Sequence, residues 1–270
     1  MPLSIENRLP LSTVTAIEKS LIASWPSLVT VVDGRWLLRA ANGFTGRANS
    51  VCILGDDGTI HPDDLNGRIA HAEAFYSRAG LVPTFRITPL TPHGLVTELH
   101  QRGYVDEDYS LVLTGALPQA SPQLGTEGFQ TKRDEDTPGD AWLNSAAALS
   151  NRVDFDRQTL AELTRRLGCN AAFFQCSEDK DAHGDHAAAI TVAACHKHWL
   201  TVHNVATASH QRRRGFARHL MWASIKWARD KGAQKLWIAV DAENAPAVGL
   251  YESLGLTLGF TYFYARKRKV

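Results

Sequence analysis

The stretch around residue 215 combines residue types that suit the binding of a phosphate group. Arg212, Gly215 and Ala217 form an R-x-x-G-x-A pattern between an apolar stretch and an amphipathic one. The first turn of a helix offers unpaired N–H groups and the positive end of the helix dipole, which together attract an anion. Small residues let a phosphate approach the backbone closely. The alternative is a surface helix start with a solvated basic run, because a short glycine motif is a weak signal on its own.

A second pattern follows one predicted helix and one predicted strand later, at residues 244–256. In one-letter code it reads N-x-x-A-x-x-L-Y-E-x-L-G-L, and its glycine, Gly255, suits the end of a helix. The two patterns, in this order and at this spacing, resemble the acyl-CoA pyrophosphate loop and the second cofactor motif of the GNAT superfamily. The resemblance is direct over residues 126–270. It implies an N-acetyltransferase that moves an acetyl group from acetyl-CoA to a primary amine by direct attack in a ternary complex.

The resemblance also implies a role for each matching residue. Backbone amides of the loop would hold the pyrophosphate, the end of the preceding strand would pair with the pantetheine arm, and Asn244 would hydrogen-bond that arm. One amide of the strand would polarise the thioester carbonyl. Tyr251 would protonate the leaving thiolate; the alternative is a tyrosine that only packs in its helix. The residues expected to bind the cofactor are Val205, Ala206, Thr207, Arg212, Arg213, Arg214, Gly215, Phe216, Ala217 and Asn244.

The general base is the least defined part of the expected site. The strand at residues 199–205 holds no carboxylate, and its titratable residue is His203. A histidine is well suited to accept a proton near pH 7. Strand alternation would place His203 on one face with Val205. A half-buried structural histidine, Asp241 or Glu243 as the base, and a route through bulk water are the alternatives.

The elements that position these residues follow a mixed α/β pattern, read from apolar periodicity. In the second part we expect helices at residues 140–150, 155–167, 216–231 and 245–254, and strands at 171–176, 186–194, 199–205, 236–240 and 261–265, with a hairpin turn at His196 and Lys197. In the first part we expect helices at 11–24, 64–78 and 93–101, and strands at 28–33, 35–41, 50–54, 84–88 and 110–114.

The two parts match each other without a gap at an offset of 152 positions, which takes Gly80 to Gly232 and Gly103 to Gly255. This favours a diverged duplication over a chance match of generic elements. The fold prediction is therefore an α/β (α+β) mixed sheet in two tandem GNAT-like domains: a degenerate copy at residues 1–116, a linker at 117–125 and a catalytic copy at 126–270. The Pro-, Gly- and Ser-rich stretch 117–138 marks the division and includes a short exposed strand.

The first copy lacks the cofactor motif. At the same offset the R-x-x-G-x-A positions fall on Ile60, Asp63 and Leu65, and Tyr251 falls on Leu99. We therefore expect this copy not to bind acyl-CoA and to act by packing against the active copy. Four of its polar residues could contact substrate or could be ordinary solvated hairpin residues: Arg39, Asn42, Arg47 and Asn49.

The amino-acid composition limits the expected partners and location of the protein. The chain has 29 basic and 28 acidic residues, for a formal net charge of +1, which argues against nucleic acid or an anionic membrane as the partner. The N-terminus lacks a signal-peptide layout, and four dispersed cysteines fit a reducing compartment, so we expect a cytoplasmic protein. The Cys, His and Asp residues within 176–198 follow no common zinc spacing, so no metal is expected. The expected partner is a small-molecule or peptide amine, with the chain a monomer or homodimer; the competing class is a non-catalytic acyl-CoA-binding or interaction module.

Overall fold

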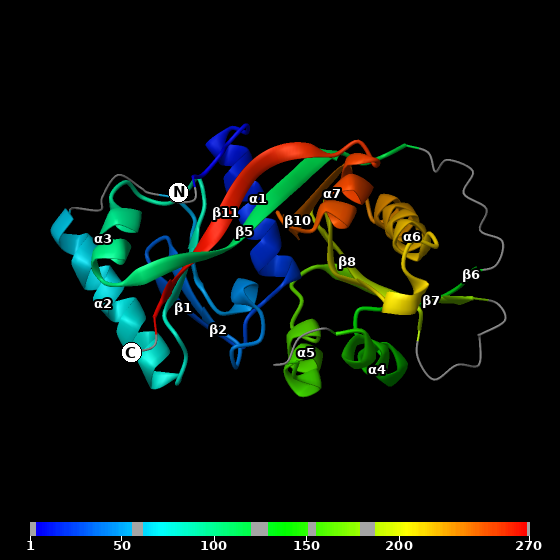
Figure 1. Cartoon of the computed structure of the whole chain (residues 1–270), viewed down its shortest axis with the longest axis horizontal. Coiled ribbons are helices and arrows are strands. Elements are labelled where there is room, and N and C mark those ends of the chain that lie inside the picture. The colour runs from blue at the N-terminus through cyan, green and yellow to red at the C-terminus, as the bar shows by residue number, and fades with distance from the viewer. Residues whose placement is uncertain (1–3, 56–61, 120–128, 151–154, 179–186, 269–270) are drawn as a thin grey trace. The chain divides into compact units, whose positions relative to one another are not determined.

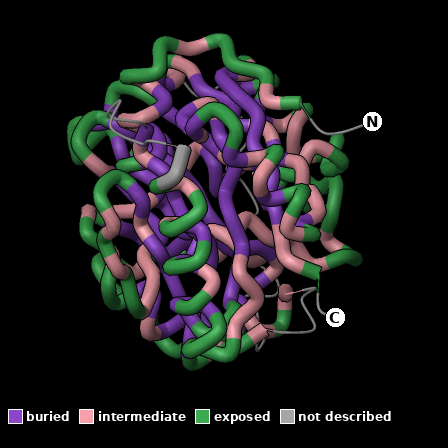
Figure 2. Tube along the Cα trace, turned by 90° about the vertical axis from the view of Figure 1, so that its left-hand side faces the viewer, coloured by how far each residue is buried: buried purple, intermediate pink, exposed green. Residues whose placement is uncertain are grey.

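The computed structural model describes residues 4–55, 62–119, 129–150, 155–178 and 187–268 of the 270-residue chain. The chain divides into two compact units (Figure 1). Unit 1 contains Met1–Leu113, Ala239–Val248 and Leu258–Val270, and unit 2 contains Thr114–Ile238 and Gly249–Thr257. Each unit is built on a β-sheet, and most of the sheet strands are buried, whereas those at Val29–Asp33 and Phe129–Glu135 are largely exposed (Figure 2).

Unit 1 holds the elements of the first sequence copy together with the last strand of the chain. Its sheet has the strand order β1-β2-β3-β4-β11-β5. The elements are α1 (Leu11–Ser24), β1 (Val29–Asp33), β2 (Trp36–Ala40), η1 (Gly46–Ala48), β3 (Val51–Ile53), α2 (Pro62–Arg78), β4 (Thr84–Ile87), α3 (Leu95–Gln101), most of β5 (Tyr104–Ala116) and most of β11 (Thr257–Lys267). Every element predicted for this part of the chain is present, and the bounds of α1 are those predicted.

One face of the unit 1 sheet forms an apolar core. Alternate residues of β2 and β4, among them Leu38, Phe85 and Ile87, pack with side chains of α2 and α3. The residues between them, Arg39 and Arg86, therefore point to the opposite face. That second face is polar and nevertheless buried.

Unit 2 holds the remaining elements around a sheet with the strand order β10-β9-β8-β7-β6. The β9–β10 pair is parallel, and the other pairs are antiparallel. The elements are β6 (Phe129–Glu135), α4 (Asp140–Leu149), α5 (Arg157–Thr164), β7 (Asn170–Glu178), β8 (Ala189–His196), β9 (Trp199–Thr207), η3 (Ser209–Gln211), α6 (Phe216–Asp230), β10 (Lys235–Asp241) and α7 (Ala245–Glu252). The last residues of β10 and the first of α7 belong to unit 1.

Several predicted element ends differ from the structure, the last strand among them, which runs over Thr257–Lys267 and not 261–265. Two of the differences have a local cause. The β8–β9 turn lies at Lys197 and His198, one residue later than predicted, because His196 still pairs with Trp199 and the backbone of Lys197 takes a left-handed φ of 55°. The helix expected at residues 155–167 is shorter, since α5 begins after its capping residue Asp156, whose side chain accepts a hydrogen bond from the Gln158 amide, and ends at Thr164.

Each unit is completed by the final strand of the other sequence copy. In unit 1, β11 pairs antiparallel with β4, with Ala265 opposite Phe85. In unit 2, the end of β5 lies beside β10, where the Thr114 hydroxyl donates a hydrogen bond to the Leu236 carbonyl at 2.9 Å. At the offset of 152 positions, α2 overlaps α6, β4 overlaps β10, α3 overlaps α7 and β5 overlaps β11. The structure thus carries two GNAT-like domains that exchange equivalent strands.

Candidate active site

Strand β9 leaves its register with β8 just after His203. His203 lies opposite Val192, but Ala206 lies opposite Ile190, so β9 uses one more residue than β8 over this interval. Asn204 takes a left-handed φ of 50° there, a conformation that asparagine tolerates better than most residues. Such a β-bulge bends the strand and interrupts its alternation. The alternation expected to place His203 and Val205 on one face therefore does not continue through Asn204.

The chain beyond the bulge leads into the predicted phosphate loop. Val205, Ala206 and Thr207 are half-buried at the end of β9, and the next amide, that of Ala208, donates to the Ala188 carbonyl at 2.9 Å. The short helix η3 follows, and then two residues with left-handed φ, Arg213 (63°) and Gly215 (92°). These two conformations turn the chain into α6.

Helix α6 begins without a side-chain cap. Gly215 occupies the capping position and has no side chain that could accept a hydrogen bond from the first-turn amides. Its carbonyl accepts the regular helical bond from His219 N–H at 2.9 Å. The N–H groups of Phe216 and Ala217 thus lie in an uncapped first turn at the positive end of a 15-residue helix. This turn can accept an anionic ligand.

The three loop arginines are all exposed but are not equivalent. The Arg214 guanidinium forms an ion pair with Glu178 at the end of β7 and also hydrogen-bonds Gln211. Within the described ranges, Arg212 and Arg213 form no ion pair. Arg214 is therefore tied to the sheet, while the charges of Arg212 and Arg213 remain available to a ligand.

An aromatic cluster from β6 supports the start of α6. The ring of Phe129 meets that of buried Phe216 edge-on at 4.9 Å and lies 5.0 Å from the ring of His219. The His219 Nε2 lies 2.7 Å from the Thr131 hydroxyl, and burial lowers the pKa of His219. Sequence reasoning missed this support, because it depends on an exposed strand that lies far from α6 in the sequence.

Both predicted catalytic residues are buried in unit 2. His203 is 1% exposed, and its ring meets Trp237 edge-on at 6.2 Å. Tyr251 is 5% exposed in α7, where its carbonyl accepts from the Leu254 and Leu256 amides. Tyr251 is thus held at the helix end that Gly255 closes.

Asn244 directly precedes α7 and belongs to unit 1. Its Oδ1 accepts a hydrogen bond from the Ala247 amide at 3.2 Å, so its side chain caps α7. The alternative bases Asp241 and Glu243 are exposed, and the Asp241 carboxylate accepts from the Glu243 amide at 2.9 Å.

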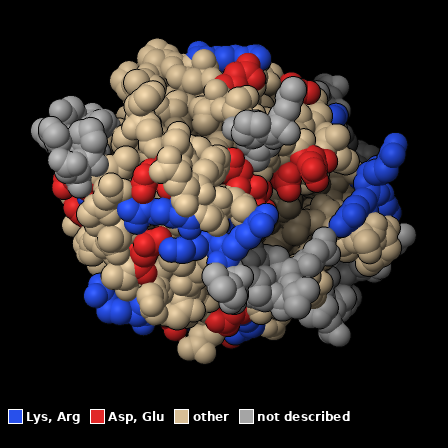
Figure 3. All heavy atoms as spheres, turned by 60° about the vertical axis from the view of Figure 1, so that its left-hand side comes forward, with Lys and Arg blue, Asp and Glu red and all other residues tan. Residues whose placement is uncertain are grey.

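The charge pattern is mixed, and the described residues form no metal centre. On the face drawn in Figure 3, basic and acidic side chains are interspersed. Among the described residues no group of three His, Cys, Asp or Glu side chains is arranged to hold a metal ion; His183, Asp185 and His186 lie outside them. Within the same limits no helix is long and apolar enough to cross a membrane.

The bulged strand, the uncapped helix start and the tandem arrangement define an acetyltransferase of the GNAT superfamily. The family model described as "Probable histone acetyltransferase Rv0428c C-terminal" matches residues 11–265, and the chain belongs to that family. It is 26% identical over 255 residues to "Uncharacterized N-acetyltransferase YobR" of Bacillus subtilis, covering 94% of this chain and 99% of that protein.

Two further comparisons extend this result. A 76-residue stretch is 37% identical to the streptothricin acetyltransferase of Streptomyces lavendulae, covering 27% of this chain and 40% of that protein. The fold resembles that of a tandem GNAT protein from the clavulanic acid biosynthesis pathway, with a TM-score of 0.63, 11% identity and coverage of 97% and 98% of the two chains. The second likeness concerns the fold alone, and it supports the tandem arrangement.

Proposed function

We propose that the chain transfers an acetyl group from acetyl-CoA to a primary amine, with the reaction at the second copy. The observation that carries this proposal is the uncapped first turn of α6, entered through the left-handed Gly215. Such a turn can accept the cofactor pyrophosphate on the amides of residues 213–217. The side chains of Arg212 and Arg213 then add positive charge beside it, whereas that of Arg214 is paired with Glu178.

The pantetheine arm would lie along the end of β9. Strand β9 pairs with β8 as far as Thr207 and with β10 over Trp199–Thr201. Backbone groups of Val205, Ala206 and Thr207 that face away from β8 would pair with an extended ligand, as an added strand would. One amide of this segment would stabilise the negative charge that develops on the thioester oxygen. Asn244 would hydrogen-bond the arm through its amide N–H groups, because its Oδ1 is used to cap α7.

The chemical step is a direct displacement. The nitrogen lone pair of a neutral amine attacks the thioester carbonyl, the C–S bond breaks, and the CoA thiolate leaves with the electron pair. Tyr251 would donate a proton to this thiolate, and the proton that the acylated nitrogen releases as it becomes an amide would restore the phenol. Because a phenol has a pKa near 10 and a thiol one near 8.5, this transfer needs close positioning.

The substrate ammonium must lose a proton before attack, and His203 is our candidate for accepting it. Its burial beside Trp237 means that the proton would reach it directly from bound substrate or through an enclosed water. Asp241 and Glu243 are the exposed alternatives. The measured pH dependence of variants at these three positions would distinguish them.

The acceptor is proposed to be an amine of a small molecule or a peptide. The likeness to a streptothricin acetyltransferase supports a small-molecule amine, and the family description supports a peptide amine.

The first copy is proposed not to bind acyl-CoA, since Leu99 stands where the second copy has Tyr251. Ile60, at the position that matches Arg212, lies outside the described residues. We further propose residues 1–116 and 126–270 as the two domains, joined by 117–125, in a monomer or homodimer.

A cytoplasmic location is proposed from the cysteines. None of the four, all of which the structure describes, forms a disulfide, as is usual in a reducing compartment.

Calorimetry followed by a turnover assay tests the proposed activity. Titration with acetyl-CoA should show one binding site per chain, and release of the CoA thiol should then depend on an added amine drawn from a panel of antibiotics, polyamines and lysine peptides. Binding without turnover across this panel would favour a non-catalytic acyl-CoA-binding module. Absence of binding would reject the assigned cofactor.

A further inference from the structure

The polar face of the unit 1 sheet is buried although strand alternation would suit it to water. Arg39 and Arg86 are 0% and 1% exposed, and Cys52 of β3 and Tyr262 of β11 lie on the same face. Helix α1 contributes Glu18, itself 1% exposed, to this cluster. Buried charges require partners, because the interior solvates them poorly. The partners of each charged group therefore decide what the cluster can do.

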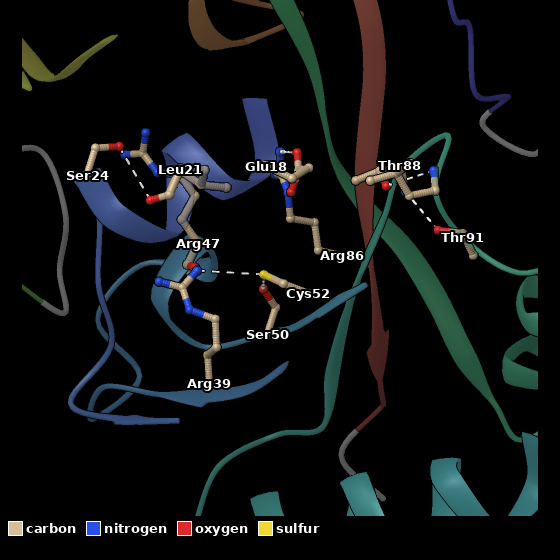
Figure 4. A network of polar contacts seen from close by, with 11 residues as sticks. Glu18, Leu21, Ser24, Arg39, Arg47, Ser50, Cys52, Arg86, Thr88 and Thr91 are labelled. Atoms are coloured by element: carbon tan, nitrogen blue, oxygen red, sulfur yellow. Dashed lines mark hydrogen bonds and ion pairs between the residues drawn. The ribbon is translucent and has the colours of Figure 1, made fainter. Parts of the chain in front are cut away.

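Arg39 has only neutral partners. Its Nη1 donates to the Arg47 carbonyl at 2.7 Å and to the Cys52 Sγ at 3.6 Å (Figure 4). Its Nη2 donates to the Trp25 carbonyl. Its Nε is buried and has no hydrogen-bond partner within the described chain. No carboxylate of the described residues pairs with Arg39. Among the described residues this fully buried guanidinium thus has no counter-ion.

Arg86 pairs with the one carboxylate of the cluster. Its Nε and Nη2 donate to the two oxygens of Glu18 at 3.1 Å and 2.9 Å (Figure 4). This two-bond ion pair uses both oxygens of Glu18. The remaining Nη1 of Arg86 is buried and unpaired among the residues described. The guanidinium also lies 3.4 Å from the centre of the Tyr262 ring.

The fully buried groups therefore carry one excess positive charge, since Arg39 and Arg86 face Glu18 alone. An uncompensated charge of this kind strongly destabilises a folded chain. We propose that unit 1 binds a small monocarboxylate between Arg39 and Arg86. One carboxylate would supply the missing charge, and its oxygens are the kind of acceptor that Arg39 Nε and Arg86 Nη1 lack among the described residues.

The local electrostatic field agrees with this assignment. Burial alone would raise the pKa of Tyr262, but the charges of Arg86 and Arg47 lower it below its ordinary value. Arg47 is half-buried, and its guanidinium lies 5.2 Å from the centre of the Trp25 ring. The cluster thus favours negative charge at Tyr262.

The charges belong to the first copy only. At the offset of 152 positions Arg39 falls on Thr191, and Arg86 falls on Ile238. Both are neutral residues of the second copy. The first copy has therefore lost the acyl-CoA motif and carries a cationic cluster that the second copy lacks, which favours a separate ligand over a remnant of the same one.

Thermal unfolding in sodium acetate, compared with sodium chloride at equal ionic strength, tests the proposal on the full chain. A ligand that binds only the folded state raises the melting temperature in a saturable way. We expect this rise for the wild type and for Arg78→Met, which removes an exposed arginine of the same unit. Arg39→Met should lose the acetate-specific rise, with acetate affinity reduced roughly tenfold or more because a charge-assisted pair is removed.

Glu18→Gln keeps the test informative if Arg39→Met does not fold. Removing the carboxylate increases the buried excess charge from one to two, so this variant should melt lower in chloride and gain more from acetate than the wild type does. A purely structural ion pair would show no acetate-specific gain in either protein, and that result would overturn the proposal. Stabilisation by inorganic phosphate without any by acetate would overturn the assigned ligand class.

Discussion

Gly215 and Phe129 face each other at the start of α6, where a β-carbon built on Gly215 would lie 3.9 Å from the Cζ of Phe129. This is an ordinary van der Waals distance, so space around the backbone does not require glycine at this position. The requirement comes from the φ of 92°, which L-residues with a side chain rarely adopt. The shape of the loop thus depends on the backbone freedom of one residue.

Gly215→Ala should weaken acetyl-CoA binding more than it destabilises the fold. A left-handed conformation costs a residue with a β-carbon about 1–2 kcal/mol, and the loop can relieve that strain by turning its amides away from the ligand. We expect a loss of affinity of roughly tenfold, measured by calorimetry. Gly232→Ala is the matched control, because Gly232 ends the same helix with a φ of 85°. It should lower the melting temperature and leave affinity unchanged; equal affinity losses at the two positions would contradict the loop assignment.

The loop arginines should contribute unequally to cofactor binding. Arg212→Ala and Arg213→Ala each remove an exposed charge that no described carboxylate neutralises, whereas Arg214→Ala removes one already paired with Glu178. The first two should therefore reduce the salt dependence of acetyl-CoA affinity more than the third. Titrations at two ionic strengths measure this difference. Three equal effects would show that the Glu178 pair opens when the cofactor binds.

Tyr251→Phe should lower turnover far more than acetyl-CoA affinity. The change removes a hydroxyl without changing the packing of a ring that is 5% exposed. Loss of a positioned acid typically costs about 10²–10⁴-fold in rate. Steady-state kinetics together with calorimetry separate rate from affinity. An unchanged rate would remove Tyr251 as the acid and leave it as a packing residue.

His203→Gln should flatten the acid side of the pH–rate profile, because glutamine does not titrate. Asp241→Asn and Glu243→Gln are the comparison variants and should keep the wild-type profile. The profile is measured at saturating acetyl-CoA over the range that brackets the ordinary histidine pKa of about 6.5. If the profile changes with either carboxylate variant and not with His203→Gln, the base is that carboxylate.

His219 should make the fold less stable in mild acid. Burial lowers its pKa below the ordinary 6.5, so the unfolded chain binds a proton more readily than the folded one. The stabilising effect is complete above pH 6.5 and is lost as the pH falls below that value towards the folded-state pKa. Urea unfolding of His219→Gln should show a shallower pH dependence than the wild type. The exposed His198→Gln should match the wild type; a His219→Gln curve parallel to the wild type would contradict this reading.

Local signals in the sequence were sufficient for most elements of the fold. The predicted helix ends at Gly80, Gly232 and Gly255 are confirmed, because all three take a left-handed φ. Strand β5 is longer than predicted, since Asp106, Glu107 and Asp108 suggest a loop. In the fold Arg266 of β11 pairs with Glu107 at 2.8 Å and with Asp108 at 2.6 Å. A partner so distant along the chain leaves no local pattern.

The candidate site could be predicted from the sequence only in part, for the same reason. The loop and its glycine form a contiguous motif, but the bulge at Asn204 depends on the register with β8. The pairing of Arg214 with Glu178 depends on where β7 ends. The buried state of Arg39 could not be inferred either, because an arginine in a predicted hairpin usually faces water. What sequence reasoning missed is thus decided by tertiary contacts.

The exchange of strands means that the first copy, which lacks the cofactor motif, cannot be removed without affecting the second. Because β11 pairs with β4, deleting residues 1–116 would remove more than an inactive half and would leave the C-terminal strand without its neighbour. An unpaired strand of this kind invites aggregation. Cutting the chain at the 117–125 linker should therefore yield two insoluble fragments. The first copy, which we propose not to bind acyl-CoA, would in this way be retained as an obligatory folding partner, whatever other ligand it binds.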